Sequence, residues 1–245
     1  DELAKEIRKA FIAPDGYQLL SVDYSQIELR VLAHLANEEH MIASFNEKHD
    51  IHNETAVQLF DIEGQQVTSD MRRKAKAVNF GIIYGISDFG LAQQIHTSPK
   101  EAKAFIEKYL DTFSGVRTYM EDIVRFCEEH GYVKTLFNRR RYLPEINAKN
   151  YARKQAAARA AMNAPIQGSA ADLMKIAMIK ISDQLTKKRL QSKLILQIHD
   201  EVIIQVHDQE VEEVVDLVVQ AMKNVATLKV ELEVDAQLGE NLYEV

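Results

Sequence analysis

Strand-forming segments lie near the two ends of this sequence, and their placement limits how the chain can fold more than any other feature. Residues 17–23 (YQLLSVD) follow a Pro-Asp-Gly turn, and residues 193–198 and 202–206 flank the tripeptide His-Asp-Glu. A closing strand is predicted near residues 229–235, whereas the long middle stretch has the periodicity of helices. Strands at both ends with helices between them predict an α+β fold, in which a sheet domain is interrupted by a helical insertion.

The composition is that of a chain able to form its own core. The sequence has 245 residues, of which 46% are apolar, with only nine glycines and four prolines. This excludes a disordered or collagen-like chain, and no apolar run approaches the about 18 residues of a membrane span. The single cysteine, Cys127, cannot form an internal disulfide, so we expect a reducing, cytosolic environment. The sequence begins at Asp1 within a helical pattern, and we expect it to be a piece of a longer chain.

Local signals predict the remaining elements. The capping box Ser98-Pro99-Lys100-Glu101 begins a helix toward Leu110, and Asn138 is the turn residue of a hairpin over residues 132–137 and 141–143. Further helices are predicted over residues 25–36, 69–84, 150–162, 169–189 and 210–224. Residues 163–165 (Asn-Ala-Pro) are expected to separate the two long helices, because proline disfavours a helix interior.

Charge is distributed unevenly, although the net charge is −7 at pH 7. Residues 139–159 contain seven basic residues and one acidic residue, and residues 72–76 contain four basic residues. Residues 200–245, in contrast, contain twelve acidic and two basic residues. Two interpretations stay open at this level. The basic segments are either solvated helix faces or local positive surfaces that bind phosphates.

A stripe of two cations and two aromatic residues is predicted on the helix that begins near residue 69. Arg72, Lys76, Phe80 and Tyr84 are each four residues apart, so each advances about 40° around the axis and all four share one face. Cations near a helix start would bind a polyanion together with the helix dipole, and the aromatic rings would contact a base or sugar. The alternative is an amphipathic helix with the aromatic residues in the core.

Carboxylates at strand ends form the second candidate site. Asp23 ends one predicted strand, and Asp200-Glu201 lies at the turn between two others. Two carboxylates held side by side repel each other unless a divalent cation lies between them, and hard oxygen ligands suit Mg²⁺. Taken singly, Asp23 could be only a helix cap, and Asp200-Glu201 only a turn.

Together these motifs resemble those of family A DNA polymerases, in the same order and approximate spacing. Residues 23–30 (DYSQIELR) resemble motif A, residues 199–201 (HDE) resemble motif C, and the helix stripe extended by Gly81 and Gly85 resembles motif B. The family's Arg-x3-Asn-x3-Gln element is present as Arg159, Asn163 and Gln167. The likeness runs from about residue 7 to about residue 238 and is greatest to the bacterial members. Asn138, where the family usually has glycine, and Leu242-Tyr243, where many relatives have tryptophan, depart from the pattern.

The resemblance implies a right-hand polymerase fold. It predicts an antiparallel palm sheet from residues 1–34 and 149–245, with packed helices, and a helical fingers insertion over residues 35–148. The thumb and the upstream palm segment are expected to lie outside this chain. An isolated piece of this kind is expected to be weakly active or inactive.

The resemblance also implies a site. Asp23, Asp200 and the Tyr24 carbonyl would bind two Mg²⁺ ions, with Glu201 assisting, and Lys76 would donate a proton to the leaving pyrophosphate. The residues implied in dNTP binding are Arg72, Lys76, Phe80, Tyr84, Glu28, Gln26 and His52. Those implied in DNA binding are Arg159, Asn163, Gln167 and His199. Glu28, with Tyr84, would exclude a 2′-hydroxyl group and so select deoxyribose.

The expected partners are primer–template DNA and dNTPs, with no membrane partner, for a monomer in the bacterial cytoplasm at the nucleoid. Two alternatives stay open. A single-subunit RNA polymerase shares the two aspartates and the Arg/Lys/Tyr stripe, although Glu28 and the Phe80-Gly81 pair disfavour it. The other alternative is a nucleic-acid-binding module without catalysis.

Overall fold

The chain folds into two compact units, which we describe separately. The computed structural model describes residues 6–63 and 66–245. The first, here called the sheet unit, comprises residues 6–27, 170–227 and 232–245, and the second, the helical unit, comprises residues 28–169 and 228–231. The sequence predicts a fingers insertion over residues 35–148, and these boundaries between palm and fingers stay a prediction. Within the described residues, no helix has both the length and the apolar character needed to cross a membrane.

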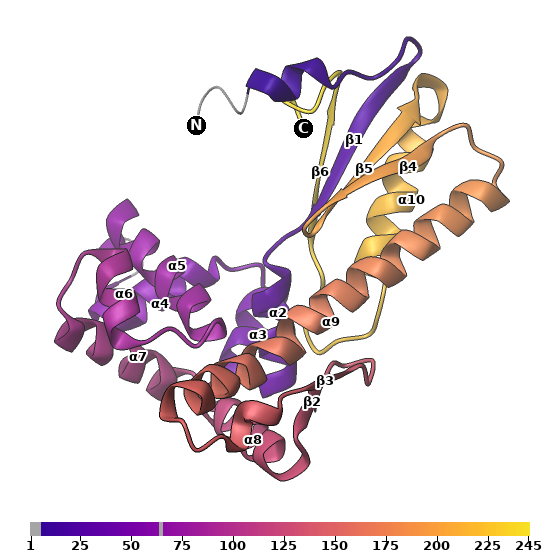
Figure 1. Ribbon diagram of the computed structural model, residues 1–245. Helices are drawn as coiled ribbons and strands as arrows, with labels where there is room; N and C mark the ends of the chain where they lie inside the picture. Colours follow the sequence, from indigo (N-terminus) through magenta and orange to yellow (C-terminus); the bar gives the residue numbers. More distant parts are fainter. Residues whose placement is uncertain (1–5, 64–65) are drawn as a thin grey trace. The chain divides into compact units, whose positions relative to one another are not determined.

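One antiparallel sheet forms the sheet unit (Figure 1). Its strands are β1 (Tyr17–Tyr24), β4 (Lys193–Ile198), β5 (Glu201–His207) and β6 (Val234–Gly239), in the order β4-β5-β1-β6. Strand β1 therefore pairs on both sides with strands from the other end of the chain. This confirms the predicted α+β fold and the meeting of the two ends in one sheet.

The core of the sheet unit is apolar and lies against one amphipathic helix. Helix α10 (Val211–Lys223) contacts β1, β5 and β6, and its buried face consists of Val214, Leu217, Val218, Ala221 and Met222. The buried strand residues Leu20, Val22, Val202 and Ile204 share one face of the sheet. Burying large aliphatic side chains stabilises such a unit by roughly 1.5–3 kcal/mol for each, relative to exposure. The short 3-10 helices η1 (Arg8–Ala10) and η4 (Asp208–Glu210) complete it.

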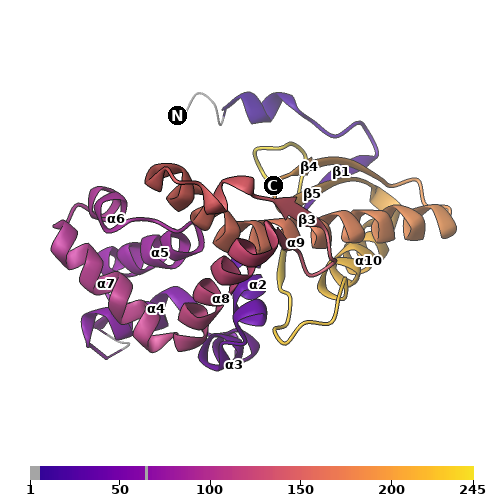
Figure 2. The ribbon, with the colours of Figure 1, turned by 60° about the horizontal axis from the view of Figure 1, so that its bottom comes forward.

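The helical unit contains the inserted helices, most of which begin where the sequence offers a cap (Figure 2). Its helices before α9 are α2 (Ile27–Ala36, which begins one residue before the unit), α3 (Glu39–Asn46), α4 (Ile51–Phe60), α5 (Ser69–Ile83), α6 (Asp88–Ile95), α7 (Pro99–Thr112) and α8 (Ser114–His130). Hydroxyl or carboxylate caps accept a backbone hydrogen bond at the start of α4, α5, α6 and α7. A hairpin of β2 (Tyr132–Lys134) and β3 (Arg140–Tyr142), with Asn138 left-handed at φ 62°, and the 3-10 helix η3 (Pro144–Asn147) follow. The predicted capping box and hairpin are confirmed.

The predicted break at residues 163–165 is wrong. Helix α9 (Tyr151–Lys187) continues through Pro165 without interruption. Pro165 has no backbone N–H, so the helix loses one hydrogen bond there. Ala164, Pro165 and Ile166 are nevertheless buried. The Ser169 hydroxyl also donates a hydrogen bond to the Pro165 carbonyl at 2.6 Å. Packing of the apolar face of α9 therefore outweighs the local preference of proline.

The closing strand also lies elsewhere than predicted. Strand β6 begins at Val234, and residues 228–231 instead belong to the helical unit. Asn46 at the end of α3 fixes them with two hydrogen bonds: its amide donates to the Lys229 carbonyl at 3.1 Å and accepts from the Glu231 amide at 2.9 Å. The Arg30 guanidinium also donates to the Glu231 carbonyl, at 2.6 Å. Side-chain partners have thus replaced the strand partner that this segment would otherwise require.

Replacing Asn46 with alanine should destabilise the protein by about 1–2 kcal/mol, because each of the two lost hydrogen bonds is worth about 1 kcal/mol. Urea unfolding measures the effect. Asn46→Asp keeps the acceptor and loses the donor, so it should fall between the wild type and alanine. Asn147→Ala removes the single bond from that amide to the Glu128 carbonyl and is the control with a smaller loss. Equal stability of Asn46→Ala and the wild type would contradict the assigned clamp.

Candidate active site

Four acidic residues meet where β1 ends. Asp23 lies opposite Glu201 of β5 on one side and opposite Asp235 of β6 on the other. Asp200 is in the two-residue turn between β4 and β5, and its carbonyl accepts a hydrogen bond from the Tyr24 amide at 3.1 Å. The sheet therefore brings the two predicted metal-binding aspartates of the sheet unit together, as the sequence led us to expect.

Burial and the neighbouring carboxylates oppose ionisation of Asp23. Burial, followed by the nearby charges of Asp200, Glu201 and Asp235, raises the pKa of Asp23 to about 6. The Oδ1 atom of Asp23 is buried without a hydrogen-bond partner. Glu201 is held by a hydrogen bond from the hydroxyl of Ser21 on β1. This cluster therefore combines like charges with a buried acceptor that has no hydrogen-bond partner among the described residues.

These residues fit a divalent cation with oxygen ligands. A bound cation would offset the repulsion and satisfy the buried Asp23 oxygen. Among residues 6–63 and 66–245, no group of three or more His, Cys, Asp or Glu side chains is arranged as a ready metal cage. The carboxylates of Asp23 and Asp200 could therefore supply only part of the ligand set, which is typical of Mg²⁺ ions that keep water or substrate phosphate as ligands.

The motif on α5 lies on an exposed face of the helical unit. The Thr68 hydroxyl accepts from the Met71 amide at 3.2 Å and so begins the helix. Arg72 and Lys76 are exposed, Phe80 is half-buried and Tyr84 is 44% exposed. The opposite face of α5 is buried and contains Ala75, Val78, Asn79, Ile82 and Ile83. The stripe therefore faces outward, and its aromatic residues are not core residues.

Arg72 is held by a carboxylate that the sequence analysis did not single out. Its Nε donates to Asp50 Oδ2 at 2.7 Å, and Asp50 also caps α4 by accepting from the His52 and Asn53 amides. Burial acts to raise the pKa of Asp50, but the hydrogen bond from Arg72 prevails and lowers it. Lys76 Nζ lies 6.0 Å from the centre of the Phe80 ring. A polyanion would have to compete with Asp50 for Arg72, whereas Lys76 is held only weakly.

His52 lies beside the stripe but is buried. Its side chain is 2% exposed, and its Nδ1 is 3.0 Å from the Asn79 amide nitrogen. Burial, then the nearby Arg72 and Lys76 charges, lower the pKa of His52 to about 4, despite the opposing effect of Asp50. The ring is therefore uncharged at neutral pH and would have to turn outward to touch a phosphate. Its assignment to dNTP binding stays a prediction.

Glu28 and Tyr84 contact each other. The Tyr84 hydroxyl donates to Glu28 Oε2 at 2.8 Å, joining the first turn of α2 to the end of α5. The two residues come from different motifs, and the sequence analysis predicted that they would act together on a sugar. The structure brings the two residues together, and their role at a sugar stays a prediction.

A cavity of about 390 Å³ opens beside the end of α5. It is lined by Phe80, Gly81, Tyr84, Gly85, Ile86, Ser87, Gln94 and Arg159. Gly85 is left-handed at φ 64°, and a Cβ atom there would lie 2.9 Å from the Arg159 Cγ. Only glycine fits both the backbone conformation and the approach of the Arg159 stem. The second glycine of the motif therefore lets an arginine from α9 reach the cavity.

The remaining predicted site residues are placed as follows. Arg159, Asn163 and Gln167 are four residues apart on α9, so they form one stripe, with Arg159 and Gln167 exposed. The Asn163 Oδ1 and Gln26 Oε1 atoms are buried without hydrogen-bond partners. Gln26 and His199 both have left-handed backbones, at φ 54° and 55°, at the ends of β1 and β4. The unsatisfied amide oxygens are acceptors available to a ligand or to water.

Sequence reasoning missed three residues of these sites. Asp235 is the fourth carboxylate of the cluster because β6 pairs with β1 so that Asp235 lies opposite Asp23. The sequence could have indicated it only if β6 had been predicted at its correct position. Ser21 is two residues before Asp23 and on the same face of β1, so period-two alternation could have indicated it. Asp50 precedes a helical segment, which is the usual signal of an N-cap, but nothing local indicated its ion pair with Arg72.

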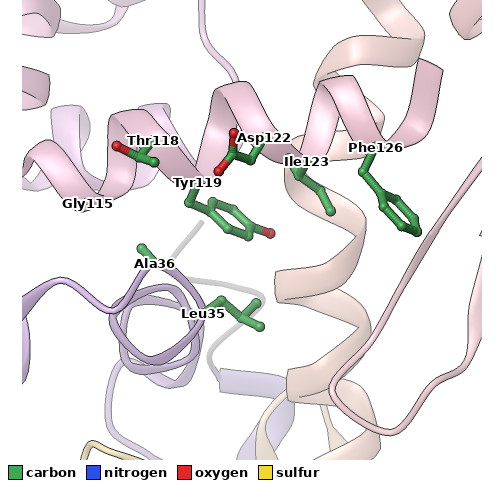
Figure 3. Close-up of a pocket in the computed structure, with 8 residues that line it drawn as sticks. All are labelled: Leu35, Ala36, Gly115, Thr118, Tyr119, Asp122, Ile123 and Phe126. Carbon is green, nitrogen blue, oxygen red and sulfur yellow. The ribbon is translucent and has the colours of Figure 1, made fainter. Parts of the chain in front are cut away.

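A second hollow, of about 420 Å³, lies between α2 and α8 in the helical unit (Figure 3). Its lining is mostly apolar, with Leu35, Ile123 and Phe126 among the contributors, and the Thr118 and Asp122 side chains at the α8 side. None of the predicted site residues is in it. We therefore do not include this hollow in the candidate site.

Clustered carboxylates on an antiparallel sheet, together with a cationic and aromatic helix, are the combination expected of a nucleotide polymerase. A family model described as DNA polymerase family A matches residues 1–244, and the chain belongs to this family. It is 50% identical over 244 residues to DNA polymerase I of Lactococcus lactis and 48% identical over 244 residues to that of Bacillus caldotenax. Each alignment covers 99% of this chain and 28% of the relative, so the chain spans about 28% of the length of these relatives.

A solved structure is also similar. It is described as the POL domain of Pol1 from M. smegmatis in complex with DNA primer-template and dNTP. The TM-score is 0.95 and the sequence identity 42%, over 100% of this chain and 43% of that one.

Asp23→Asn should stabilise the protein at neutral pH. The pKa of Asp23 is raised in the folded state, so the unfavourable charge is present above about pH 6 and is lost below about pH 4, where the carboxyl is protonated in both states. The amide should therefore raise the unfolding free energy by about 1 kcal/mol at pH 7.5, after allowance for solvent screening, and by nothing at pH 3.5.

Thermal unfolding in the presence of a chelator measures this difference. Asp15→Asn, at an exposed turn, is the matched control and should change little at either pH. A loss of stability in Asp23→Asn at pH 7.5 would show that the carboxylate is not under repulsion.

Proposed function

We propose that the protein from which this chain comes carries out template-directed DNA synthesis, transferring the nucleotidyl group of a dNTP to a primer 3′-hydroxyl and releasing pyrophosphate. The carboxylate cluster around Asp23 is the single observation that supports this most, since its buried, unpartnered oxygen calls for a cation. Family membership and the similarity to a polymerase domain support the same reaction. We expect the protein to act as a monomer in the cytoplasm, at the nucleoid, in DNA replication or repair.

The carboxylates of Asp23 and Asp200, with the Tyr24 carbonyl, would hold two Mg²⁺ ions. When bound, these ions would lower the pKa of the attacking hydroxyl and stabilise charge on the phosphate oxygens. Glu201, held by Ser21, adds negative potential that favours cation binding. An amide in place of either aspartate would keep the shape but lose the charge that holds a cation.

Arg72 and Lys76 would bind the triphosphate. Both are exposed, Arg72 at the end of the first turn of α5, where the helix dipole also favours an anion, and Lys76 one turn further along. The Arg72 guanidinium can bind phosphate oxygens once its hydrogen bond to Asp50 is broken. The Lys76 ammonium can donate a proton to the departing pyrophosphate. Asp50 keeps the two cations from repelling each other before the anion arrives.

Glu28 and Tyr84 would select the sugar. Their 2.8 Å hydrogen bond turns the Glu28 carboxylate toward the aromatic end of the stripe, where the nucleoside of a bound dNTP would lie. A 2′-hydroxyl group there would clash or leave a buried polar group unpaired, and both cost binding energy. This contact favours a DNA polymerase over the RNA polymerase alternative.

Arg159, Asn163 and Gln167 would contact the duplex near the primer end, and His199 would lie beside the primer terminus. Minor-groove acceptors are nearly the same for every base pair, so amide and guanidinium donors there test pair shape without reading identity. Those residues of the basic segment 139–159 that lie outside the β2–β3 hairpin would add phosphate contacts that are insensitive to sequence. Such indifference to sequence is what a polymerase requires.

Asp200→Asn and Asp23→Asn in the full-length protein should each lower the rate of primer extension by about 100-fold or more, since charge stabilisation of this kind is among the largest catalytic effects. Extension of a labelled primer on a template with dNTPs and Mg²⁺ measures the rate. Asp208→Asn, exposed in η4 of the same unit, is the control and should extend normally.

A normal rate in either Asp23→Asn or Asp200→Asn would refute the proposed function. The 245-residue chain, assayed beside the full-length protein, separates loss of the reaction from incompleteness of the piece. If both the 245-residue chain and the full-length protein bind duplex DNA but neither extends a primer, the alternative of a nucleic-acid-binding module would be favoured.

Glu28→Ala should admit ribonucleotides, raising the use of rNTP relative to dNTP by about 10-fold or more. Single-nucleotide incorporation with each substrate measures the ratio. Glu28→Gln keeps the size of the side chain and is the matched control, which should retain discrimination if the effect is steric. An unchanged ratio in Glu28→Ala would exclude this role.

A further inference from the structure

Five side chains form a continuous aromatic ladder at the end of α8 and on the adjoining hairpin. The His130 and Phe126 rings are stacked at 4.1 Å, and Phe126 meets Tyr132 edge-on at 5.6 Å. Tyr132 in turn lies 5.7 Å from Tyr142 of β3, and the Arg140 guanidinium lies 4.6 Å above the Tyr132 ring. All five belong to the helical unit, and none is among the predicted site residues.

The ladder is open to solvent at its hairpin end. Tyr142 is 67% exposed and Arg140 is exposed, whereas Phe126 is half-buried beside the hollow shown in Figure 3. Tyr132 and Tyr142 are directly opposite each other in the antiparallel register, so their rings lie on the same face of the hairpin. Tyr142 contacts one ring of the series, Tyr132, in a tilted arrangement, and its exposure leaves ring surface open to solvent.

The same face of the hairpin carries a pair of like charges. Lys134 and Arg140 are directly opposite each other in register, an arrangement that destabilises a two-stranded ribbon. Neither forms an ion pair with a carboxylate in residues 6–63 and 66–245, whereas the Glu129 carboxylate lies 4.0 Å from His130 at the opposite end of the ladder. The tyrosines account in part for Arg140, because its guanidinium lies over the Tyr132 ring and hydrogen-bonds the Tyr142 side chain, but they do not account for Lys134 opposite it.

We propose that this face of the β2–β3 hairpin binds single-stranded nucleic acid, with one base stacked on Tyr142 and the adjoining phosphates beside Arg140 and Lys134. Alternating aromatic and cationic side chains are the arrangement by which proteins hold unpaired strands. A duplex would not suit it, because its bases are already stacked and cannot present a face to a tyrosine. Template-directed synthesis requires an unpaired template strand, and this face would give the protein a further contact with it. The assignment of nucleic acid as the ligand therefore rests on the proposed function.

Binding of a fluorescein-labelled, unpaired oligodeoxyadenylate to the full-length protein tests the site. Fluorescence anisotropy, without dNTP or divalent cation, gives the dissociation constant, so a failure of synthesis does not affect the result. Tyr142→Ala should weaken binding by about 5-fold or more, the effect of one lost base–aromatic stack. Tyr142→Phe keeps the ring and should bind as the wild type does.

An abasic oligonucleotide of the same length separates stacking from charge. It has the same phosphates and no bases, so Tyr142→Ala should not change its affinity. Arg140→Ala should instead lower the slope of log K against log salt by about 0.7, the effect of one lost phosphate contact on a single strand. Arg140→Lys should retain that slope.

Tyr243→Ala is the matched control, because Tyr243 is also an exposed tyrosine with a cation, Lys9, 4.5 Å above its ring. It should leave the affinity unchanged. The proposal would be overturned if Tyr142→Ala bound the oligodeoxyadenylate as tightly as the wild type does. It would also be overturned if Tyr142→Ala lost as much affinity for the abasic strand, or for a blunt duplex, as for the oligodeoxyadenylate. If Tyr142→Ala fails to fold, Tyr142→Leu and the salt slope of Arg140→Ala decide it, since leucine keeps an apolar side chain of similar reach but cannot stack.

Discussion

The pairing of β1 with β5 and β6 is the interaction on which the sheet unit depends. These strands come from opposite ends of the chain, so the helical segment between them has to be accommodated before the sheet can close. The pairing places Asp23 between Glu201 and Asp235, and the cost is visible in the raised pKa of Asp23. A sheet selected for stability alone would not concentrate carboxylates there. A cation at the proposed site would offset this repulsion.

The helical unit is organised around one helix with two different faces. The buried face of α5 contains Asn79, which contacts both His52 and Thr55 of α4 and so fixes the packing of the two helices. The exposed face carries the cations and aromatic rings. Asp50 links the packing of the helices to the exposed stripe, because its one carboxylate both caps α4 and forms an ion pair with Arg72. Hydrogen bonds on the buried side of α5 thus fix the position of the helix that carries the cations and aromatic rings on its exposed side.

Most of the elements could be predicted from local signals, because caps and turns act within a few residues. Thr68, Ser98 and Asn138 are at the helix starts and the hairpin turn where the sequence indicated them. The errors arose where distant contacts prevailed. Burial around Pro165 kept α9 continuous, and Asn46 captured residues 228–231 that have the apolar pattern of a strand. In the site, Asp235 was missed for the same reason, since its place beside Asp23 follows from the shifted start of β6.

The sequence by itself determined the chemistry of this protein: which carboxylates, cations and aromatic residues are present, and at what spacing within each motif. Spacing within a single helix settles which side chains share a face, so the α5 and α9 stripes were readable without a structure. Only the tertiary structure decided which residues from different segments touch. The Tyr84–Glu28 bond, the Arg72–Asp50 pair and the ladder from His130 to Tyr142 each depend on packing between elements, and local preference carries no information about such contacts.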